Sequence, residues 1–282
     1  MAPWGKALAA EPPPEVTTIR FEKDTGACIA PQVFQELLRA EGFTDIRYVD
    51  ETEERVRRAD AAKSGGIADM IAHGEVDFGR DFAPSLALGM NAGAPVTVLS
   101  GLHLGCFEVF GKKEIRTLAD LKGRTVGVPV YQNAGDRPLL TIMTSLVGLD
   151  PAKDLHWVTD PSLRPLDLFA EGKIDAFIAA PPVLQEVRAR NIGHVIVSSI
   201  TDRPWSQYYC CMLATSTEFA RNYPVATKRV LRAILKAADL CVSEPKRVAQ
   251  GYAKRYDYAL QALSEIRYDV WRDYDPEDSL RF

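Results

Sequence analysis

Apolar and polar positions follow two different periods along the chain. In "VTTIRF" (16–21) and "DIRYVD" (45–50), β-branched and aromatic residues are interleaved with polar ones, which predicts strands. Residues 225–242 have the period of a helix, with an apolar face made of Val230, Ala233, Ile234, Ala237 and Cys241. Strand and helix patterns alternate from residue 16 to residue 199. We therefore predict an α/β fold with largely parallel sheets covered by helices on both faces.

Two stretches of the chain have nearly the same pattern. "HGEVDFGRDFAP" (73–84) and "EGKIDAFIAAPP" (171–182) each predict a helix that ends at a glycine, a short buried strand, and a turn that opens a new helix. Open α/β sheets bind ligands at the carboxyl ends of their strands, so two facing turns predict a ligand crevice between two units. The alternative is a generic βα unit that occurs twice without a special role.

The order of the predicted elements indicates two lobes. The chain is expected to cross between them at about 100–102 and again at about 199–204, with the last segment returning to the first lobe. The predicted boundaries are 16–101 and 203–282 for lobe 1 and 102–202 for lobe 2, after a leader at 1–15. Local patterns also predict a helix over Pro31–Arg39 and strands over Val76–Gly79 and Val96–Leu99.

Composition narrows the class of function. The net charge is −4 and no long block of Lys or Arg occurs, which argues against nucleic-acid binding. Five cysteines are too few and odd in number for a disulfide framework, and no CxxC or HExxH spacing supports a metal site. We predict no metal and no cofactor. No run of about 18 apolar residues indicates a membrane-spanning helix.

The N-terminal stretch "MAPWGKALAAEPPPE" contains small residues that are similar to the end of a signal peptide. It predicts an extracytoplasmic protein. The basic start and the apolar core of such a peptide are missing, so a cytosolic leader stays an alternative.

Several stretches resemble the nitrate, sulfonate and taurine class of periplasmic substrate-binding proteins. They are "GEVDFGRDFAPSLA", "VLSGLHLGCFEVFG", "TLADLKGRTVGVP", "LFAEGKIDAFIAAPP" and "YPVATKRVLRAILKA". The resemblance implies a type II Venus-flytrap fold with a double-strand hinge, a periplasmic location, and a monomer that delivers a small solute to an ABC permease of the inner membrane. The class also resembles the fungal enzyme that makes the thiamine pyrimidine. That enzyme is the competing hypothesis, although its cysteine-rich run, thought to serve iron, is matched here only by Cys210 and Cys211.

Candidate ligand-binding residues of lobe 1 lie in loops at predicted strand ends. The loop "KDTGACIAP" enters a helix whose free N–H groups can hold an anion, and "GRDFAP" contributes charged and aromatic groups. Helix capping and a surface salt bridge are the respective alternatives. His103, in the predicted first crossover, is either a ligand contact or a structural histidine. The candidates of lobe 1 are Lys23, Thr25, Cys28, Arg80, Asp81, Phe82 and His103.

The facing candidates come from lobe 2 and from the hinge. "VPVYQNAGDRP" opens a predicted helix, where Asn133 could equally be a cap. "DRPWSQYYCCM" offers rings with polar tips for a crevice floor, and either Tyr208 or Tyr209 is expected to face inward. Neighbouring residues of a strand point to opposite faces, so Cys210 and Cys211 are expected to pack separately. The candidates are Tyr131, Gln132, Asn133, Pro181, Trp205, Gln207 and Tyr208. Together they predict a small organic ligand, anionic or heteroaromatic.

Overall fold

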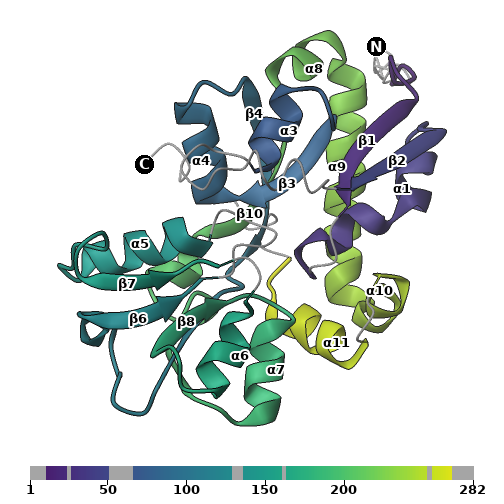
Figure 1. Cartoon of the computed structure of the whole chain (residues 1–282). Helices are drawn as coiled ribbons and strands as arrows, with labels where there is room; N and C mark the ends of the chain where they lie inside the picture. The colour runs from purple at the N-terminus through teal and green to yellow at the C-terminus, as the bar shows by residue number, and fades with distance from the viewer. Residues whose placement is uncertain are drawn as a thin grey trace, which may run out of the picture.

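A computed structural model describes residues 11–23, 27–50, 66–128, 136–160, 163–252 and 256–268. These residues form two five-stranded sheets, each flanked by helices (Figure 1). The predicted fold class, an α/β fold with two lobes, is therefore confirmed. None of the helices in these ranges is both long and apolar enough to span a membrane.

The first sheet has the strand order β2-β1-β3-β10-β4. β1 pairs in parallel with β2 and β3, whereas β10 runs antiparallel between β3 and β4. The strands are β1 (Thr18–Lys23), β2 (Asp45–Asp50), β3 (Phe78–Phe82), β4 (Val96–Leu104) and β10 (Tyr209–Ser216). Because β10 follows residue 198 in the chain, this sheet is assembled from two distant segments.

The second sheet has the order β7-β6-β8-β5-β9. β6 is parallel to β7 and β8, and β5 is antiparallel to both β8 and β9. The strands are β5 (Glu108–Gly111), β6 (Arg124–Gly127), β7 (Leu155–Val158), β8 (Ala176–Ala179) and β9 (His194–Ser198). The two sheets thus have related topologies, as the repeated sequence pattern predicts. The lobe boundaries given above remain a prediction.

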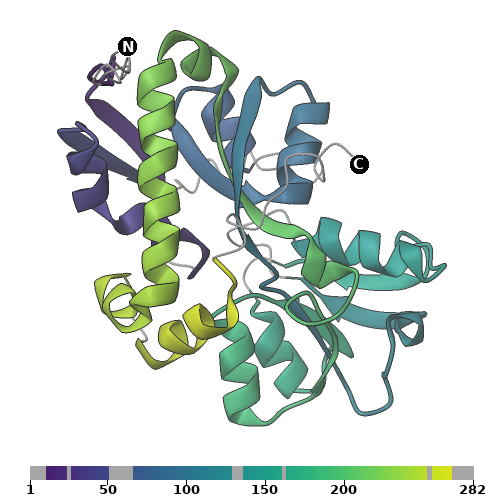
Figure 2. The same ribbon diagram turned by 180° about the vertical axis from the view of Figure 1, so that it is seen from behind.

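Helices cover the sheets because each has one apolar face. Within α9, the predicted apolar face is buried: Val230, Ala233 and Ile234 pack in the core of the first sheet (Figure 2), and Ala237 and Cys241 pack in the core shared by the two sheets. The helices are α1 (Gln35–Ala40), α3 (Ile67–Ala72), α4 (Ala83–Asn91), α5 (Asp136–Leu146), α6 (Pro165–Ala170), α7 (Val183–Arg190), α8 (Thr217–Asn222), α9 (Pro224–Ser243), α10 (Pro245–Tyr252) and α11 (Tyr256–Glu265), with 3-10 helices η1 (Ala27–Val33), η2 (Leu118–Leu121) and η3 (Trp205–Gln207). Glu265 of α11 accepts a hydrogen bond from Arg188 of α7, so the C-terminal helices also contact lobe 2.

Two chain crossings join the sheets, and they are hydrogen-bonded to each other. The N–H of Ser199 donates to the carbonyl of Phe107 at 2.8 Å, and the N–H of Phe107 donates to Oγ of Ser199 at 2.9 Å. β4 continues to Leu104, beyond the predicted end at Leu99, so His103 lies on a strand and not in the crossover. Pairing with β10, which no local pattern shows, extends the strand.

Two further local predictions need correction. The predicted helix over Pro31–Arg39 is split into η1 and α1, since the backbone of Phe34 (φ −79°, ψ 70°) leaves the helical region between them. The predicted strand Val76–Gly79 is shifted to Phe78–Phe82, where β10 supplies antiparallel partners.

Candidate functional site

Charged side chains are buried where β1 and β3 end, at the junction of the two sheets. Glu22 of β1 and Arg80 and Asp81 of β3 are each no more than 2% exposed. Oε1 of Glu22 accepts a hydrogen bond from the backbone N–H of Arg80 at 2.9 Å and lies 4.0 Å from Nε of the same residue. Close by, the rings of Phe82 and Phe107 touch edge to face with centroids 4.9 Å apart. A buried contact between a carboxyl group and a guanidinium thus lies beside an aromatic contact that joins the sheets.

Burial changes the acidity of both carboxyl groups. Loss of solvation raises the pKa of Glu22 to about 8, although Arg80 opposes the shift. Loss of solvation also raises the pKa of Asp81 to about 7, against hydrogen bonds from backbone N–H groups. Near neutral pH Glu22 is therefore mostly protonated and Asp81 is partly protonated, so the charge of Arg80 is only partly balanced.

The carboxyl group of Asp81 also accepts hydrogen bonds from the backbone. Its Oδ2 accepts from the N–H of Ile67 at 3.1 Å, at the start of α3, and its Oδ1 accepts from the N–H of Phe82 at 2.7 Å. A carboxylate at a helix N-terminus satisfies free N–H groups and interacts favourably with the helix dipole. Asp81 therefore holds α3 against β3.

Four of the five cysteines converge beside this cluster. Sγ of Cys28 lies 3.7 Å from that of Cys106, Cys106 lies 2.8 Å from Cys210, and Cys210 lies 3.9 Å from Cys211. Nη1 of Arg80 is 3.8 Å from Sγ of Cys211. All four cysteines are buried free thiols.

These thiols do not have equal acidity. Burial would raise the pKa of Cys211, but hydrogen bonds from Cys106, Cys210 and Cys28 hold the pKa well below its ordinary value. The pKa of Cys106 and of Cys210 is raised, mainly by burial, and that of Cys28 is raised, mainly by its contact with Cys106. Cys211 is therefore the preferred thiolate, with the guanidinium of Arg80 beside it.

Comparison with protein families matches residues 55–248 to the family described as "NMT1/THI5 like". This match covers more than half of the chain. The chain belongs to the NMT1/THI5-like family. The predicted resemblance to nitrate- and sulfonate-type binding proteins is thereby confirmed.

One curated relative of this NMT1/THI5-like protein is the bicarbonate-binding protein CmpA of Synechococcus elongatus. It is 27% identical over 100 residues, which are 36% of this chain and 22% of the relative. The matched segment thus spans about a fifth of the relative's length.

Solved structures share the fold at low sequence identity. The alkanesulfonate-binding protein SsuA from Xanthomonas axonopodis pv. citri, bound to MOPS, has a TM-score of 0.68 at 16% identity, covering 92% of this chain and 86% of its own. The aliphatic sulphonate-binding protein SsuA from Escherichia coli has a TM-score of 0.69 at 18% identity, covering 90% of this chain and 84% of its own. The nitrate-binding protein NrtA from Synechocystis PCC 6803 has a TM-score of 0.68 at 15% identity, covering 89% of this chain and 70% of its own.

The structure brings some predicted site residues together. Cys28, Arg80, Asp81, Phe82 and His103 all belong to the buried cluster at the junction. The surface salt-bridge alternative for Arg80 and Asp81 is therefore wrong, because both side chains lie inside the sheet.

The other predicted residues lie around this junction or outside the described residues. Lys23 ends β1 with an exposed side chain, Pro181 is buried just after β8, and Trp205 packs partly buried on the core shared by the two sheets. Gln207 and Tyr208 are exposed on the second crossing, whereas the ring of Tyr209 lies against Gly101. Thr25, Tyr131, Gln132 and Asn133 lie outside the residues that the structure describes.

The expectation that Cys210 and Cys211 pack on opposite faces is wrong. Register shifts between β10 and β4 on both sides of Cys211 break the strict alternation, so the two sulfurs are neighbours. Sequence reasoning also missed Glu22 and Cys106. The available signal for Glu22 was an acidic residue next to Phe21 in a strand buried by helices.

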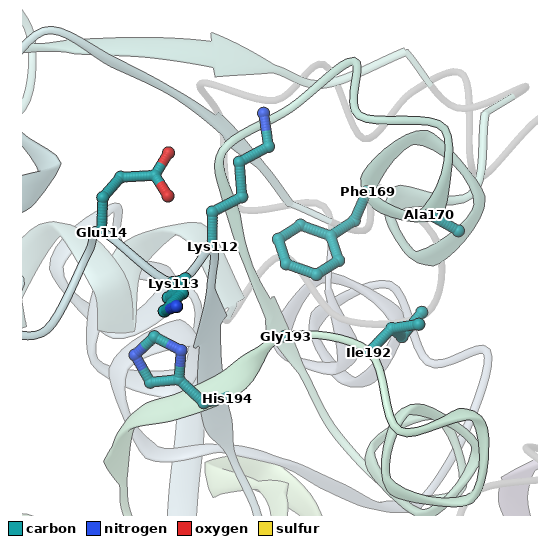
Figure 3. A pocket seen from close by; sticks show the side chains of 8 residues that line it. All are labelled: Lys112, Lys113, Glu114, Phe169, Ala170, Ile192, Gly193 and His194. Carbon is teal, nitrogen blue, oxygen red and sulfur yellow. The ribbon is translucent and has the colours of Figure 1, made fainter.

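A hollow of about 510 Å³ on the second lobe is not part of this junction (Figure 3). It is lined by Lys112, Lys113, Glu114, Phe169, Ala170, Ile192, Gly193 and His194. Phe169 and Ala170 end α6, and the other residues lie after β5 or lead into β9. This is the edge opposite the carboxyl ends of β6 and β8. Nζ of Lys112 already pairs with Asp175 at 2.8 Å.

Proposed function

We propose that this protein is the solute-binding receptor of an ABC import system and captures a small organic ligand between its two lobes. The observation that carries the proposal is the buried cluster of Glu22, Arg80 and Asp81 at the carboxyl ends of β1 and β3, where open α/β sheets bind ligands. Family membership and the names of relatives that bind bicarbonate, nitrate or alkanesulfonates support it.

The charges of this cluster bear on the class of ligand. Arg80 supplies one buried positive charge, but Glu22 pairs with it and Asp81 follows it in the strand. A fully charged inorganic anion would therefore meet two carboxyl groups as well as the guanidinium. A flat heteroaromatic body, or an organic body with one weakly acidic group, fits this balance together with the rings of Phe82, Trp205 and Tyr208.

The second lobe would supply the remaining ligand contacts. Tyr131, Gln132, Asn133 and Pro181 would approach the ligand from the second sheet, opposite Lys23, Thr25 and Cys28. Such a receptor functions as a periplasmic monomer that docks on an inner-membrane permease. It returns its ligand chemically unchanged and carries out no catalysis.

A thermal-shift screen tests the proposal. Sodium nitrate, bicarbonate, a short alkanesulfonate and an aminopyrimidine are each added to the full chain, and a ligand that binds the folded state raises the melting temperature. We expect the aminopyrimidine or the sulfonate to raise it. Tyr208→Ala, at an exposed ring, should weaken binding of the same compound by about 0.5–1.5 kcal/mol, whereas Leu146→Ala on α5 should not.

Two outcomes would contradict this function. One is the absence of a shift with every compound. The other is mass spectrometry that finds the bound compound converted to a product, which would indicate an enzyme.

A further inference from the structure

Two cysteines that flank the second sheet in the sequence lie in contact at the hinge. Sγ of Cys106 lies 2.8 Å from Sγ of Cys210, although the two residues are 104 positions apart. The neighbouring sulfur pairs, Cys28–Cys106 and Cys210–Cys211, are farther apart, at 3.7 Å and 3.9 Å. A disulfide holds its sulfurs about 2.05 Å apart, so a bond between Cys106 and Cys210 needs a further approach of less than about 1 Å.

Strand pairing holds the backbone around both residues in place. Tyr209 of β10 is paired with Leu104 of β4, so Cys210 directly follows this pair and Cys106 lies two residues beyond it. Cys210 also lies at a register shift between the two strands, which releases its side chain from strict alternation. The two sulfurs are therefore brought together by a paired backbone and not by the reach of their side chains alone.

A bond between these cysteines would close a loop that contains the whole second sheet. The strands β5 to β9 and the helices α5, α6 and α7 all lie between residues 106 and 210. The loop begins in the first crossing and ends just after the second, where Phe107 and Ser199 are already hydrogen-bonded to each other. Cross-linking the ends of so long a segment removes conformational entropy from the unfolded chain. The bond would also fix the spacing of the two crossings that form the hinge.

Two further thiols flank this pair. Cys28 of η1 lies beside Cys106, and Cys211 of β10 lies beside Cys210, so the four sulfurs form a continuous series of contacts. The guanidinium of Arg80 lies 3.8 Å from Sγ of Cys211, and a nearby positive charge favours the thiolate form of a cysteine. A thiolate within reach of a disulfide can attack it, so a bond at this place is open to exchange.

We propose that Cys106 and Cys210 are a redox-active pair whose reversible disulfide joins the two crossings of the hinge. The oxidant is a low-molecular-weight disulfide such as oxidised glutathione. One cysteine attacks that disulfide and displaces a thiol, and the second cysteine then displaces the other thiol, so that two electrons and two protons pass to the oxidant. Both side chains are buried in the folded chain, so this exchange takes place during folding, before the lobes have packed. The inference does not depend on the ligand or on the proposed transport function.

Refolding under controlled redox conditions tests the pair. The full chain is unfolded in urea with a reductant and refolded in a buffer of reduced and oxidised glutathione or in dithiothreitol, and its free thiols are then alkylated under denaturing conditions. After the glutathione buffer we expect two of the five cysteines to escape alkylation, whereas all five react after dithiothreitol. Peptide mapping should join Cys106 to the segment that contains Cys210. The oxidised chain should melt about 5–15 °C above the reduced chain.

Matched variants assign the bond within the cysteine cluster. Cys106→Ala and Cys210→Ala should each leave every remaining cysteine open to alkylation and abolish the rise in melting temperature. Cys211→Ala is the control inside the cluster, and Cys241→Ala, on α9, is the control outside it. Both controls should form the bond as the unchanged chain does. Circular dichroism shows whether each variant is folded, and the peptide map of the unchanged chain decides the question for any variant that is not.

Three results would overturn the proposal. The first is an unchanged chain that refolds in the glutathione buffer with all five cysteines reactive, or that refolds only in dithiothreitol. The second is a disulfide that maps to another pair of cysteines, or that persists in the Cys106→Ala or Cys210→Ala variant. The third is a Cys106–Cys210 bond that leaves the melting temperature equal to that of the reduced chain, because such a bond would not restrain the hinge.

Discussion

At the scale of single residues, buried ionisable groups dominate the junction between the sheets. Glu22, Arg80 and Asp81 have little access to water, so each depends on its neighbours for its charge state. Removing the guanidinium of Arg80 would leave two carboxyl groups and the Cys211 sulfur without their nearest positive charge. The cluster therefore couples the protonation of the site to the stability of the fold.

Glu22 should make stability fall as the pH rises. Its pKa in the folded chain is about 8, above the ordinary 4.5, so between these values the native state keeps a proton that the unfolded state has released. The stabilisation is complete below the ordinary pKa and is lost as the pH rises through about 8. Denaturant unfolding between about pH 5 and about pH 8 should show a decrease of up to ~1.4 kcal/mol per pH unit from this group.

Glu22→Gln supplies the control for this dependence. Asp81, whose pKa is also raised, is present in both proteins, so the difference between their pH profiles isolates Glu22. The variant should lose stability less steeply with rising pH. Parallel profiles for the two proteins would show that Glu22 titrates normally.

At the scale of elements, the two hinge crossings depend on a close backbone approach. Gly105 lies between β4 and β5 with φ +32°, and a Cβ there would lie 1.9 Å from the carbonyl oxygen of Ser199 and 2.8 Å from Cα of Ile200. Both contacts are with the backbone of the second crossing, which cannot yield without breaking the hydrogen bonds between Ser199 and Phe107. A glycine at this position therefore sets how closely the crossings pair.

Gly105→Ala should destabilise the protein by about 3 kcal/mol or more, because it combines backbone overlap with strain. Gly123→Ala is the matched control: φ is +72° and nothing lies within 4 Å of the added Cβ, so only backbone strain of about 1–2 kcal/mol applies. Urea unfolding of both variants measures the difference. Equal losses would mean that the crossings separate at little cost.

At the scale of the whole molecule, the protein is two sheets joined by a paired hinge and by the contact of α11 with α7. A ligand held between the lobes binds the closed arrangement more tightly than an open one, and that difference in affinity shifts the hinge equilibrium. The hydrogen bond between Arg188 of α7 and Glu265 of α11 would either be kept during closure, so that α11 moves with the second lobe, or limit how far the lobes move apart.

Small-angle scattering measures this closure. With the compound that gives the largest thermal shift, we expect a smaller radius of gyration than without it. A compound from the same screen that gives no thermal shift is the control and should leave the radius unchanged. An equal radius with the binding compound would place the ligand on one lobe alone.

The sequence by itself determined the class of fold and most of the element order. Strand and helix patterns are local, so "DIRYVD" predicts β2 with the observed bounds and residues 225–242 predict the buried face of α9. The repeated turn pattern and the stretch "ADLKGRTVGV" were enough to indicate two related sheets and the family.

Only the tertiary structure decided the chemistry of the junction. Cys28, the stretch from His103 to Cys106, and Cys210 are distant in sequence, and no spacing rule relates residues brought together by η1, β4 and β10. The insertion of β10 between β3 and β4 buries Arg80 and Asp81. The local sequence around these two residues is equally compatible with an exposed turn. Register shifts then bring Cys210 and Cys211 to the same side, against the alternation of an ideal strand. Burial and convergence depend on long-range pairing, which hydrophobic periodicity does not encode.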